Sequence, residues 1–280
     1  MDKYFEIAKI KYCVSGDGDK ITVGEILENF VSASSDKSRS LEVFVKDELS
    51  LPQGSKIYDD TMRVVYKNGK GYIRYEGVKS GDLSKAYLRI EAKDDYVRTE
   101  IKSDAANEKS LLTAMELEHN ITENKGILLH CSYIVYGDEA ILFTAPSGTG
   151  KSTQAKLWQD TRGARLINGD RAAVMLTKDG VVAAGIPYCG SSGVRINHTC
   201  KVRAVVYLSQ SNVNTVIKLS GLRAFKRIWE GITLNIWHRN DVEKATDTVL
   251  EIAENVPVYH LSCVADETAV KALEEALDNN

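Results

Sequence analysis

Several features that mark whole classes of protein are scarce or missing in this sequence. No apolar run approaches the ~20 residues that a membrane-spanning helix needs, and the first residues, MDKYFEIAKIKY, lack the apolar stretch of a signal peptide. The 36 Lys and Arg residues nearly balance the 39 Asp and Glu residues, so the net charge of -3 provides no basic surplus for nucleic acid or a membrane surface. We therefore expect a cytoplasmic protein that holds any anionic ligand at a local site.

Cysteine and proline are also sparse. The five cysteines are far apart in the sequence and form no C-x-x-C pair, which argues against a disulfide framework and against a structural zinc site. Only 4 prolines occur, and the 43% hydrophobic and 27% charged content is that of an ordinary folded protein. At roughly 150 residues per domain, the length leaves room for about two domains.

The first hundred residues alternate apolar and polar side chains. The runs YFEIAKIKYCV, LEVFVKDEL, TMRVVYKNGKGYIRYEG and AYLRIEAKDDYVRTEI have the period of two that is typical of strands. Asn68 and Gly69 predict a hairpin turn, and TVGEILENFV, residues 22–31, predicts a short helix that begins with a capping box. We expect residues 1–104 to form a small, mostly antiparallel β domain, whose role the sequence does not indicate.

The spacing of apolar residues changes near residues 102–110, from a period of two to one typical of helices. Residues 105–280 are expected to form an α/β domain. A helix is predicted over residues 110–123, with Ser110 as its N-cap. Apolar runs then predict strands at 126–136, 139–145, 164–167, 181–186 and 202–208. Helical spacing predicts further helices at 151–160, 222–234, 241–255 and 266–278, with the one at 222–234 facing the core through Leu222, Phe225, Ile228, Trp229 and Ile232.

The most informative segment is ILFTAPSGTGKSTQAKLW, in which an apolar strand leads into a glycine-rich loop and then a helix. This is the context of a P-loop, where backbone amides and a helix N-terminus hold the phosphates of a nucleoside triphosphate. Lys151 is expected to reach the β and γ phosphates, and the Ser152 hydroxyl to ligate Mg²⁺. Ala145 replaces the first glycine of the strict pattern. The expected nucleotide-binding residues are Ser147, Gly148, Thr149, Gly150, Lys151, Ser152 and Thr153.

An acidic residue follows the next predicted strand. Asp170 ends the segment ARLINGD, and a strand beside the P-loop strand would bring its end next to the γ phosphate. A carboxylate there can take a proton from an attacking hydroxyl, ligate Mg²⁺, or do both. The competing interpretation is a turn aspartate after Asn168 and Gly169.

These motifs resemble those of the HPr kinase/phosphorylase-like P-loop kinases, distant relatives of phosphoenolpyruvate carboxykinase. The resemblance covers about residues 126–275 and includes the sequence LHCS with His130, fifteen residues before Ala145, the loop SGTGKST, and Asp170 followed by Arg171. The segment GIPYCG resembles the G-x-P-W-x-G segment of smaller bacterial relatives. The resemblance implies that Asp170 is the general base and that His130 lies near the reacting phosphate.

The chain departs from that family at two places. Gly169 and Asp170 stand where HPr kinases carry two adjacent aspartates, and no segment matches the second signature region of the bifunctional enzyme. Taken alone, His130 would be a core histidine in a buried strand. Its spacing from the P-loop makes a role beside Asp170 an equal alternative. The remaining histidines have no spacing typical of metal ligation; they are His119, His198, His238 and His260.

The loop GIPYCGSSGVRINHT is the candidate binding site for the phosphoryl acceptor. Tyr188, Arg195 and the nearby Arg171 offer hydrogen bonds and positive charge there, although an ordinary surface loop is an equal alternative.

The sequence thus predicts a kinase that uses ATP and Mg²⁺ and phosphorylates a hydroxyl of a small molecule or a peptide serine. The catalytic residues would be Asp170, Lys151 and His130, with Ser152 and Asp170 at the metal. The first alternative is a nucleotide-binding regulatory or peptide-recognition module without transfer activity, and a carboxykinase acting on oxaloacetate is a more distant one. No nucleic-acid or membrane partner is expected, and a homo-oligomer stays open.

Overall fold

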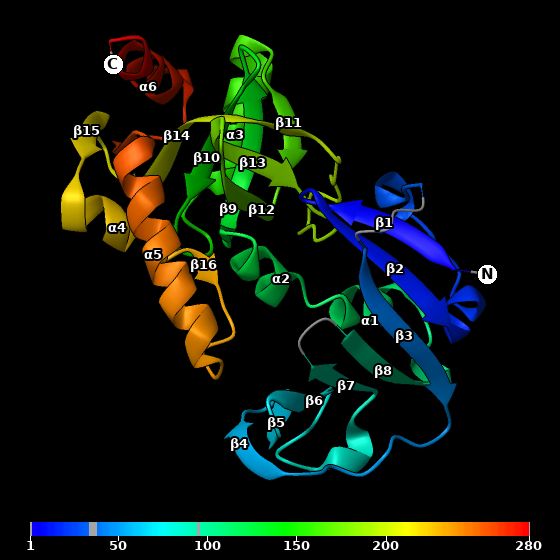
Figure 1. The fold of residues 1–280 in the computed structure, drawn as a ribbon. Coiled ribbons are helices and arrows are strands. Elements are labelled where there is room, and N and C mark those ends of the chain that lie inside the picture. Colours follow the sequence, from blue (N-terminus) through cyan, green and yellow to red (C-terminus); the bar gives the residue numbers. More distant parts are fainter. Residues whose placement is uncertain (1, 34–37, 94–95, 280) are drawn as a thin grey trace. The chain divides into compact units, whose positions relative to one another are not determined.

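Two successive parts of the chain each form a β-sheet with its own hydrophobic core (Figure 1). The computed structural model describes residues 2–33, 38–93 and 96–279. It divides into the units Met1–Leu117 and Glu118–Asn280. The sequence pattern changes slightly earlier, near residues 102–110. The fold is therefore a mixed, sheet-rich α/β chain in two units.

The first unit is built on an eight-stranded sheet with the order β1-β2-β3-β8-β7-β6-β5-β4. The pairs β2–β3 and β3–β8 are parallel and the other neighbours are antiparallel, so antiparallel pairing predominates. The strands are β1 Lys3–Ile7, β2 Ile10–Gly16, β3 Arg39–Lys46, β4 Ser55–Asp59, β5 Arg63–Asn68, β6 Gly71–Glu76, β7 Leu88–Lys93 and β8 Tyr96–Lys102. The helices are the 3₁₀ turns η1 Asp17–Lys20, η2 Glu28–Phe30, η3 Leu83–Lys85 and η4 Ser103–Ala105, and the α-helix α1 Glu108–Ala114.

The helix predicted over residues 22–31 is wrong, because only η2 is helical there. The Glu108 carboxylate accepts hydrogen bonds from the backbone amides of Gly24, Ile26 and Leu27. Those amides are satisfied by a side chain distant in sequence, and the segment keeps an irregular path that still buries Leu27 and Phe30.

The second unit combines a nine-stranded sheet system with helices (Figure 1). Its strands are β9 Gly126–Tyr136, β10 Glu139–Thr144, β11 Arg165–Asn168, β12 Arg171–Thr177, β13 Gly180–Gly185, β14 Thr199–Gln210, β15 Thr215–Leu219, β16 Ile232–Thr233 and β17 Val258–Cys263. Its helices are α2 Leu117–Glu123, α3 Lys151–Arg162, α4 Gly221–Trp229, α5 Arg239–Asn255 and α6 Glu267–Asp278. No helix among the described residues is both long and apolar enough to cross a membrane.

The long strands β9 and β14 connect this sheet system. Strand β10 pairs antiparallel with β9 and parallel with β14, and β14 also pairs parallel with β17. The opposite edge of β9 pairs with β11 and β12, whereas β16 pairs with Leu128 and Leu129 on the edge that β10 occupies farther along β9. Because β10, β14 and β17 run in the same direction, their carboxyl ends meet at one edge, which is where parallel sheets carry ligand sites.

Two helix predictions in this region need correction. The helix predicted over 110–123 is two helices, α1 and α2, since Glu116 between them takes a positive φ of 50°, and the N-cap is Asn107 rather than Ser110. The helix predicted over 222–234 ends at Trp229 because Ile232 and Thr233 pair with β9. Leu222, expected in the core, is 80% exposed. The helices predicted at 241–255 and 266–278 are confirmed as α5 and α6.

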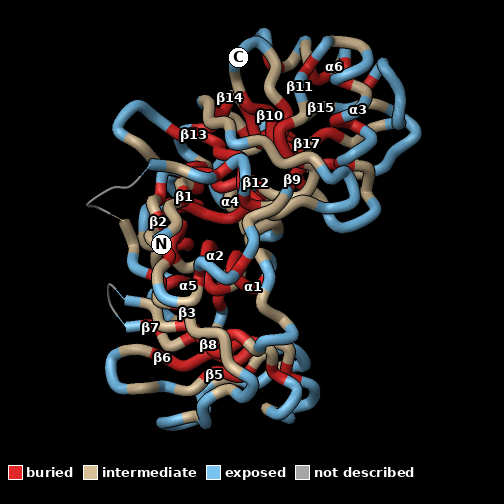
Figure 2. Tube along the Cα trace, turned by 90° about the vertical axis from the view of Figure 1, so that its right-hand side faces the viewer, coloured by how far each residue is buried: buried red, intermediate tan, exposed pale blue. Residues whose placement is uncertain are grey.

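The P-loop helix α3 is held by the core beneath it. Its Trp158 is fully buried, and the Trp158 ring meets that of Tyr136 edge-to-face at 5.1 Å between centroids. The Phe143 ring lies 6.4 Å away at a tilt of 46°. In Figure 2 the buried residues follow the central strands of the second unit, which carry this packing. The body of α3 is therefore packed against β9 and β10.

Candidate nucleotide-binding site

The glycine-rich loop joins the end of β10 to the start of α3, as the sequence predicts for a P-loop. Gly148 and Gly150 have φ angles of 77° and 117°, in a region of backbone conformation that residues other than glycine rarely adopt. A Cβ added at either position would meet nothing within 4 Å. The two glycines are therefore required by backbone conformation, and the space above the loop is open.

The loop presents unpaired donors to that space. Within the described residues, the backbone amides of Gly150, Lys151 and Ser152 donate to no protein acceptor, as expected for a helix start. The Lys151 ammonium, which is largely buried, donates to the carbonyl oxygens of Ala145 at 2.9 Å and Pro146 at 3.4 Å. Burial lowers the pKa of Lys151. Such a set of amides and one ammonium suits a polyanion.

Asp170 and His130 lie together beside this loop. Asp170 sits in the turn between β11 and β12, with one carboxylate oxygen 3.6 Å from His130 Nε2 and the other 3.3 Å from Arg171 Nε. Burial and the positive charge of Lys151 lower the pKa of His130, although Asp170 opposes the shift. These causes link Lys151, His130 and Asp170 electrostatically, so the structure brings the three predicted catalytic residues into one cluster.

The route by which Asp170 reaches the site differs from the expectation. Strand β11 is not the neighbour of β10, because it pairs with β9, which lies between them. His130 stands on β9 and pairs with Arg171, while the next residue along β9, Cys131, pairs with Thr144 at the end of β10. Strand β9 therefore places His130 next to both the P-loop, which follows Thr144, and the turn that carries Asp170, which precedes Arg171.

Asn168 is a site residue that sequence reasoning treated only as a turn former. It is fully buried, and its Oδ1 accepts the amides of Asp170 and Arg171 at 2.9 and 3.0 Å. Its Nδ2 donates to the carbonyl oxygens of Ile186 and Tyr188 at 3.0 and 2.6 Å. One side chain thus fixes both the Asp170 turn and the start of the candidate acceptor loop. An asparagine at the end of an apolar strand was the available signal.

The three candidate acceptor contacts are distributed around that loop. The Arg171 guanidinium lies 5.4 Å from the centroid of the Tyr188 ring. Arg195 forms an isolated backbone bridge with Asn168, and its Nε donates to the carbonyl of Gly193 at 3.4 Å. Ser152 and Thr153 are exposed on the first turn of α3. All of the predicted site residues therefore belong to the second unit.

Two cavities flank the P-loop, and both are bounded by Pro146 and Tyr207. Their volumes are about 420 and 360 Å³. The Tyr207 ring lies under the Arg227 guanidinium at 4.1 Å, and Glu230 lines the smaller cavity. Sequence reasoning missed Tyr207 and Glu230. The position of Tyr207 near the carboxyl end of β14 was the signal, because β14 runs parallel to β10.

The larger cavity is lined by Pro146, Ser147, Gly148, Thr149, Tyr207, Leu208, Ser209 and Gln210. The smaller one is lined by Thr144, Ala145, Pro146, Tyr207, Glu230 and Gly231.

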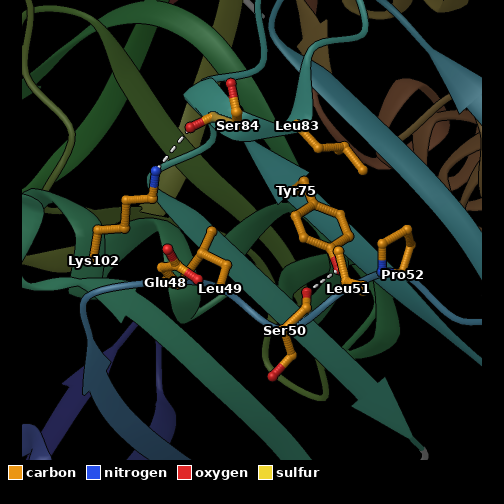
Figure 3. Close-up of a pocket in the computed structure, with 9 residues that line it drawn as sticks. All are labelled: Glu48, Leu49, Ser50, Leu51, Pro52, Tyr75, Leu83, Ser84 and Lys102. Atoms are coloured by element: carbon orange, nitrogen blue, oxygen red, sulfur yellow. Dashed lines mark hydrogen bonds between the residues drawn. The ribbon is translucent and has the colours of Figure 1, made fainter.

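The first unit has a pocket of its own, of about 310 Å³ (Figure 3). The Tyr75 hydroxyl donates to the Ser50 carbonyl at 2.6 Å, and Lys102 Nζ donates to the Ser84 carbonyl at 2.8 Å. The polar ends of Tyr75 and Lys102 are thus bonded to the pocket wall. The lining residues are Glu48, Leu49, Ser50, Leu51, Pro52, Tyr75, Leu83, Ser84 and Lys102.

Comparison with known proteins gives little beyond this geometry. No family model and no curated protein matches the chain. Among solved structures, the chain is similar to the HPr(Ser) kinase/phosphatase from Coxiella burnetii, with a TM-score of 0.32 and 13% sequence identity, over 54% of this chain and 98% of that one.

Proposed function

We propose that the chain is an ATP-dependent phosphotransferase that requires Mg²⁺ and transfers the γ-phosphoryl group to a hydroxyl. The observation that carries the proposal is the cluster at one sheet edge, where unpaired P-loop amides border open space and the Lys151 ammonium lies beneath the loop near the Asp170–His130 pair. A phosphate holder next to a carboxylate and a neutral imidazole is the arrangement that phosphoryl transfer to an alcohol needs.

Each residue has a specific task in this proposal. The amides of residues 147–152 and the Lys151 ammonium hold the β and γ phosphates. The oxygen donors Ser152 and Asp170 match the ligand preference of Mg²⁺, which supplies charge neutralisation on the phosphates when bound. Asp170 accepts the proton of the acceptor hydroxyl as the new O–P bond forms and the bond to the leaving ADP breaks.

His130 and Glu230 complete the proposed site. Because its pKa is lowered, the His130 imidazole is neutral near pH 7 and orients Asp170 without adding positive charge. Glu230 offers a second carboxylate in the cavity beside the loop, in a chain that has Gly169 where HPr kinases have an aspartate.

The acceptor and the nucleoside are assigned to different sides of the loop. The cavity bounded by Ser147, Tyr207 and Gln210 adjoins the phosphate site and suits the nucleoside. Arg171, Tyr188 and Arg195 lie on the side of Asp170, where an anionic small molecule or a peptide serine would approach.

The test compares Asp170→Asn with the wild-type chain. Incubation with ATP, Mg²⁺ and candidate acceptors should release ADP above the acceptor-free background, and Asp170→Asn should keep nucleotide binding while losing transfer by roughly 100-fold or more. Asp179→Asn is the matched control, since Asp179 is exposed in the β12–β13 turn. Transfer by Asp170→Asn at the wild-type rate would remove Asp170 from the mechanism.

One observation favours a nucleotide-binding module without transfer activity. The Asp170 carboxylate lies close to the His130 imidazole and to the Arg171 guanidinium. Ion pairs of this kind also occur where an aspartate only stabilises the local structure. This second candidate predicts stoichiometric ATP binding with no acceptor-dependent ADP.

A further inference from the structure

A second cluster of side chains lies outside the proposed catalytic site. His119 on α2 directs Nδ1 at Asp241 Oδ1 and Oδ2, at 2.9 and 3.1 Å. His238, the residue before α5, directs Nδ1 at Asp241 Oδ1 at 2.7 Å. One ligand atom from each of the three residues lies within 4.8 Å of the other two. The cluster was not visible in the sequence, because His119 is far from the other two residues along the chain.

The buried carboxylate in this cluster has no permanent positive charge beside it. Asp241 is fully buried, and among the described residues its ion-pair partners are His119 and His238, with no lysine or arginine. The Asn235 amide at 3.5 Å is neutral. A buried anion needs a countercharge or polar partners, and here those partners are two residue types that also ligate metal ions. A cation bound between the three side chains would neutralise the buried carboxylate.

We propose that His119, His238 and Asp241 bind a divalent transition-metal ion of the Zn²⁺ class. In a tetrahedral site with bonds of 2.0–2.1 Å, ligand atoms are about 3.3 Å apart. Each imidazole nitrogen lies 2.7 to 3.1 Å from the Asp241 carboxylate, which is a hydrogen-bond distance, and these two separations would lengthen by a few tenths of an ångström in a metal site. The two imidazole nitrogens lie within 4.8 Å of each other, so small side-chain movements bring all three ligand atoms to the required spacing. A metal would bind the lone pair at Nδ1 of each imidazole, with the N–H of the neutral ring on Nε2, so that both histidines would ligate without becoming imidazolates.

The donor set indicates which cation fits. Two imidazole nitrogens and one carboxylate suit Zn²⁺, Co²⁺ or Fe²⁺, whereas Mg²⁺ and Ca²⁺ prefer oxygen ligands. The site is therefore chemically distinct from the Mg²⁺ proposed near Ser152. The imidazole side chains are 17% and 28% exposed, which leaves a path for the ion and room for water as a further ligand.

The elements that carry the ligands are already fastened together. The Glu123 carboxylate on α2 accepts hydrogen bonds from Asn240 at 3.1 Å and Lys244 at 2.7 Å, both on α5. The ligands are thus preorganised, which favours tight binding. The segment leading to α5 also begins at Gly231, whose carbonyl accepts the His130 amide at 2.7 Å. The metal would fix residues 231–238, the segment that contacts His130 through Gly231.

The test is a Co²⁺ and Zn²⁺ titration of the full chain after chelator treatment, without nucleotide. The wild-type protein should bind one equivalent of Co²⁺ with the visible absorption of a four- or five-coordinate site, and Zn²⁺ should displace it. The Trp237 ring lies 5.6 Å from the His238 ring, so tryptophan fluorescence should change at the same stoichiometry.

Three variants decide the outcome. His119→Gln and His238→Gln should each weaken metal binding by roughly 100-fold or more, because each removes one of three protein ligands. His198→Gln, outside the cluster, should bind as the wild type does. Circular dichroism verifies that each variant is folded. The proposal is overturned if the wild-type chain binds no equivalent of metal, or if both glutamine variants bind it with wild-type affinity.

Discussion

Lys151 is the residue on which nucleotide binding should depend most. Its ammonium now rests on the loop carbonyls of Ala145 and Pro146, and it has no carboxylate partner among the described residues. Phosphates offer it charged acceptors, and a hydrogen bond to a charged group contributes about 1.5–3 kcal/mol. Lys151→Ala should therefore weaken ATP binding by roughly 10- to 100-fold, as measured by calorimetry.

The control for this substitution lies on the same helix. Lys156 on α3 is exposed and pairs with Asp160 at 2.9 Å, so Lys156→Ala removes an equal charge away from the loop. It should leave the ATP dissociation constant within about twofold, since exposed ion pairs contribute little. Wild-type affinity in Lys151→Ala would contradict the assignment of the P-loop.

His130 should make the stability of the chain sensitive to acid. Because its pKa is lowered in the folded state, mainly by burial and then by Lys151, the unfolded chain binds more protons below its ordinary pKa of 6.5. The free energy of unfolding should then fall as the pH drops from 7 to 5. His130→Gln keeps the backbone bonds to Gly231 and Thr144 and removes this contribution.

The measurement is denaturant unfolding of both proteins at pH 7 and pH 5. The variant should lose less stability between the two values than the wild type does. Equal losses would mean that the His130 imidazole titrates alike in the folded and unfolded chain.

At the residue scale, local motifs were readable and long-range partners were not. The P-loop residues and Asp170 were predicted because their chemistry depends on neighbours along the chain. Asn168, Tyr207 and Glu230 were missed because their roles come from contacts between distant segments. His119 and His238 were dismissed as ligands on spacing alone, yet the fold places both against Asp241.

At the scale of elements, α3 depends on one large side chain. Trp158 fills the space between α3 and the strands β9 and β10. Trp158→Ala should lower the free energy of unfolding by about 3–5 kcal/mol, since it leaves a cavity in a closed core. Leu222→Ala is the control, because Leu222 is 80% exposed on α4 and its loss should cost less than about 0.5 kcal/mol. Equal costs in denaturant unfolding would contradict this account of the core.

Elements were predictable where periodicity was long and undisturbed. Helices α5 and α6 follow their apolar spacing closely. The predicted helix at 22–31 failed because Glu108 captures its amides, and the one at 222–234 was cut short by pairing of Ile232 with β9. The expected pairing of β11 with β10 failed because β9 takes the place between them. In each case a partner far along the chain overrode a local pattern.

At the scale of the whole molecule, the two units differ in their spectroscopic content. The three tryptophans, Trp158, Trp229 and Trp237, all belong to Glu118–Asn280. The proposed nucleotide site is in the same unit. Tryptophan fluorescence therefore reports on the unit that binds the ligand, whereas far-ultraviolet circular dichroism reports on both sheets.

This difference allows binding to be located within the intact chain. A ligand present at 100 times its dissociation constant stabilises the folded state by about 2.7 kcal/mol. For a unit of this size, that gain raises the midpoint of thermal unfolding by roughly 5–10 °C. MgATP should therefore shift the transition followed by tryptophan fluorescence in the wild type, and at the same concentration the shift in Lys151→Ala should be no more than about half as large. A shift of equal size in that variant would mean that ATP stabilises the chain from somewhere other than the P-loop, because the substitution removes the ammonium that the phosphates require.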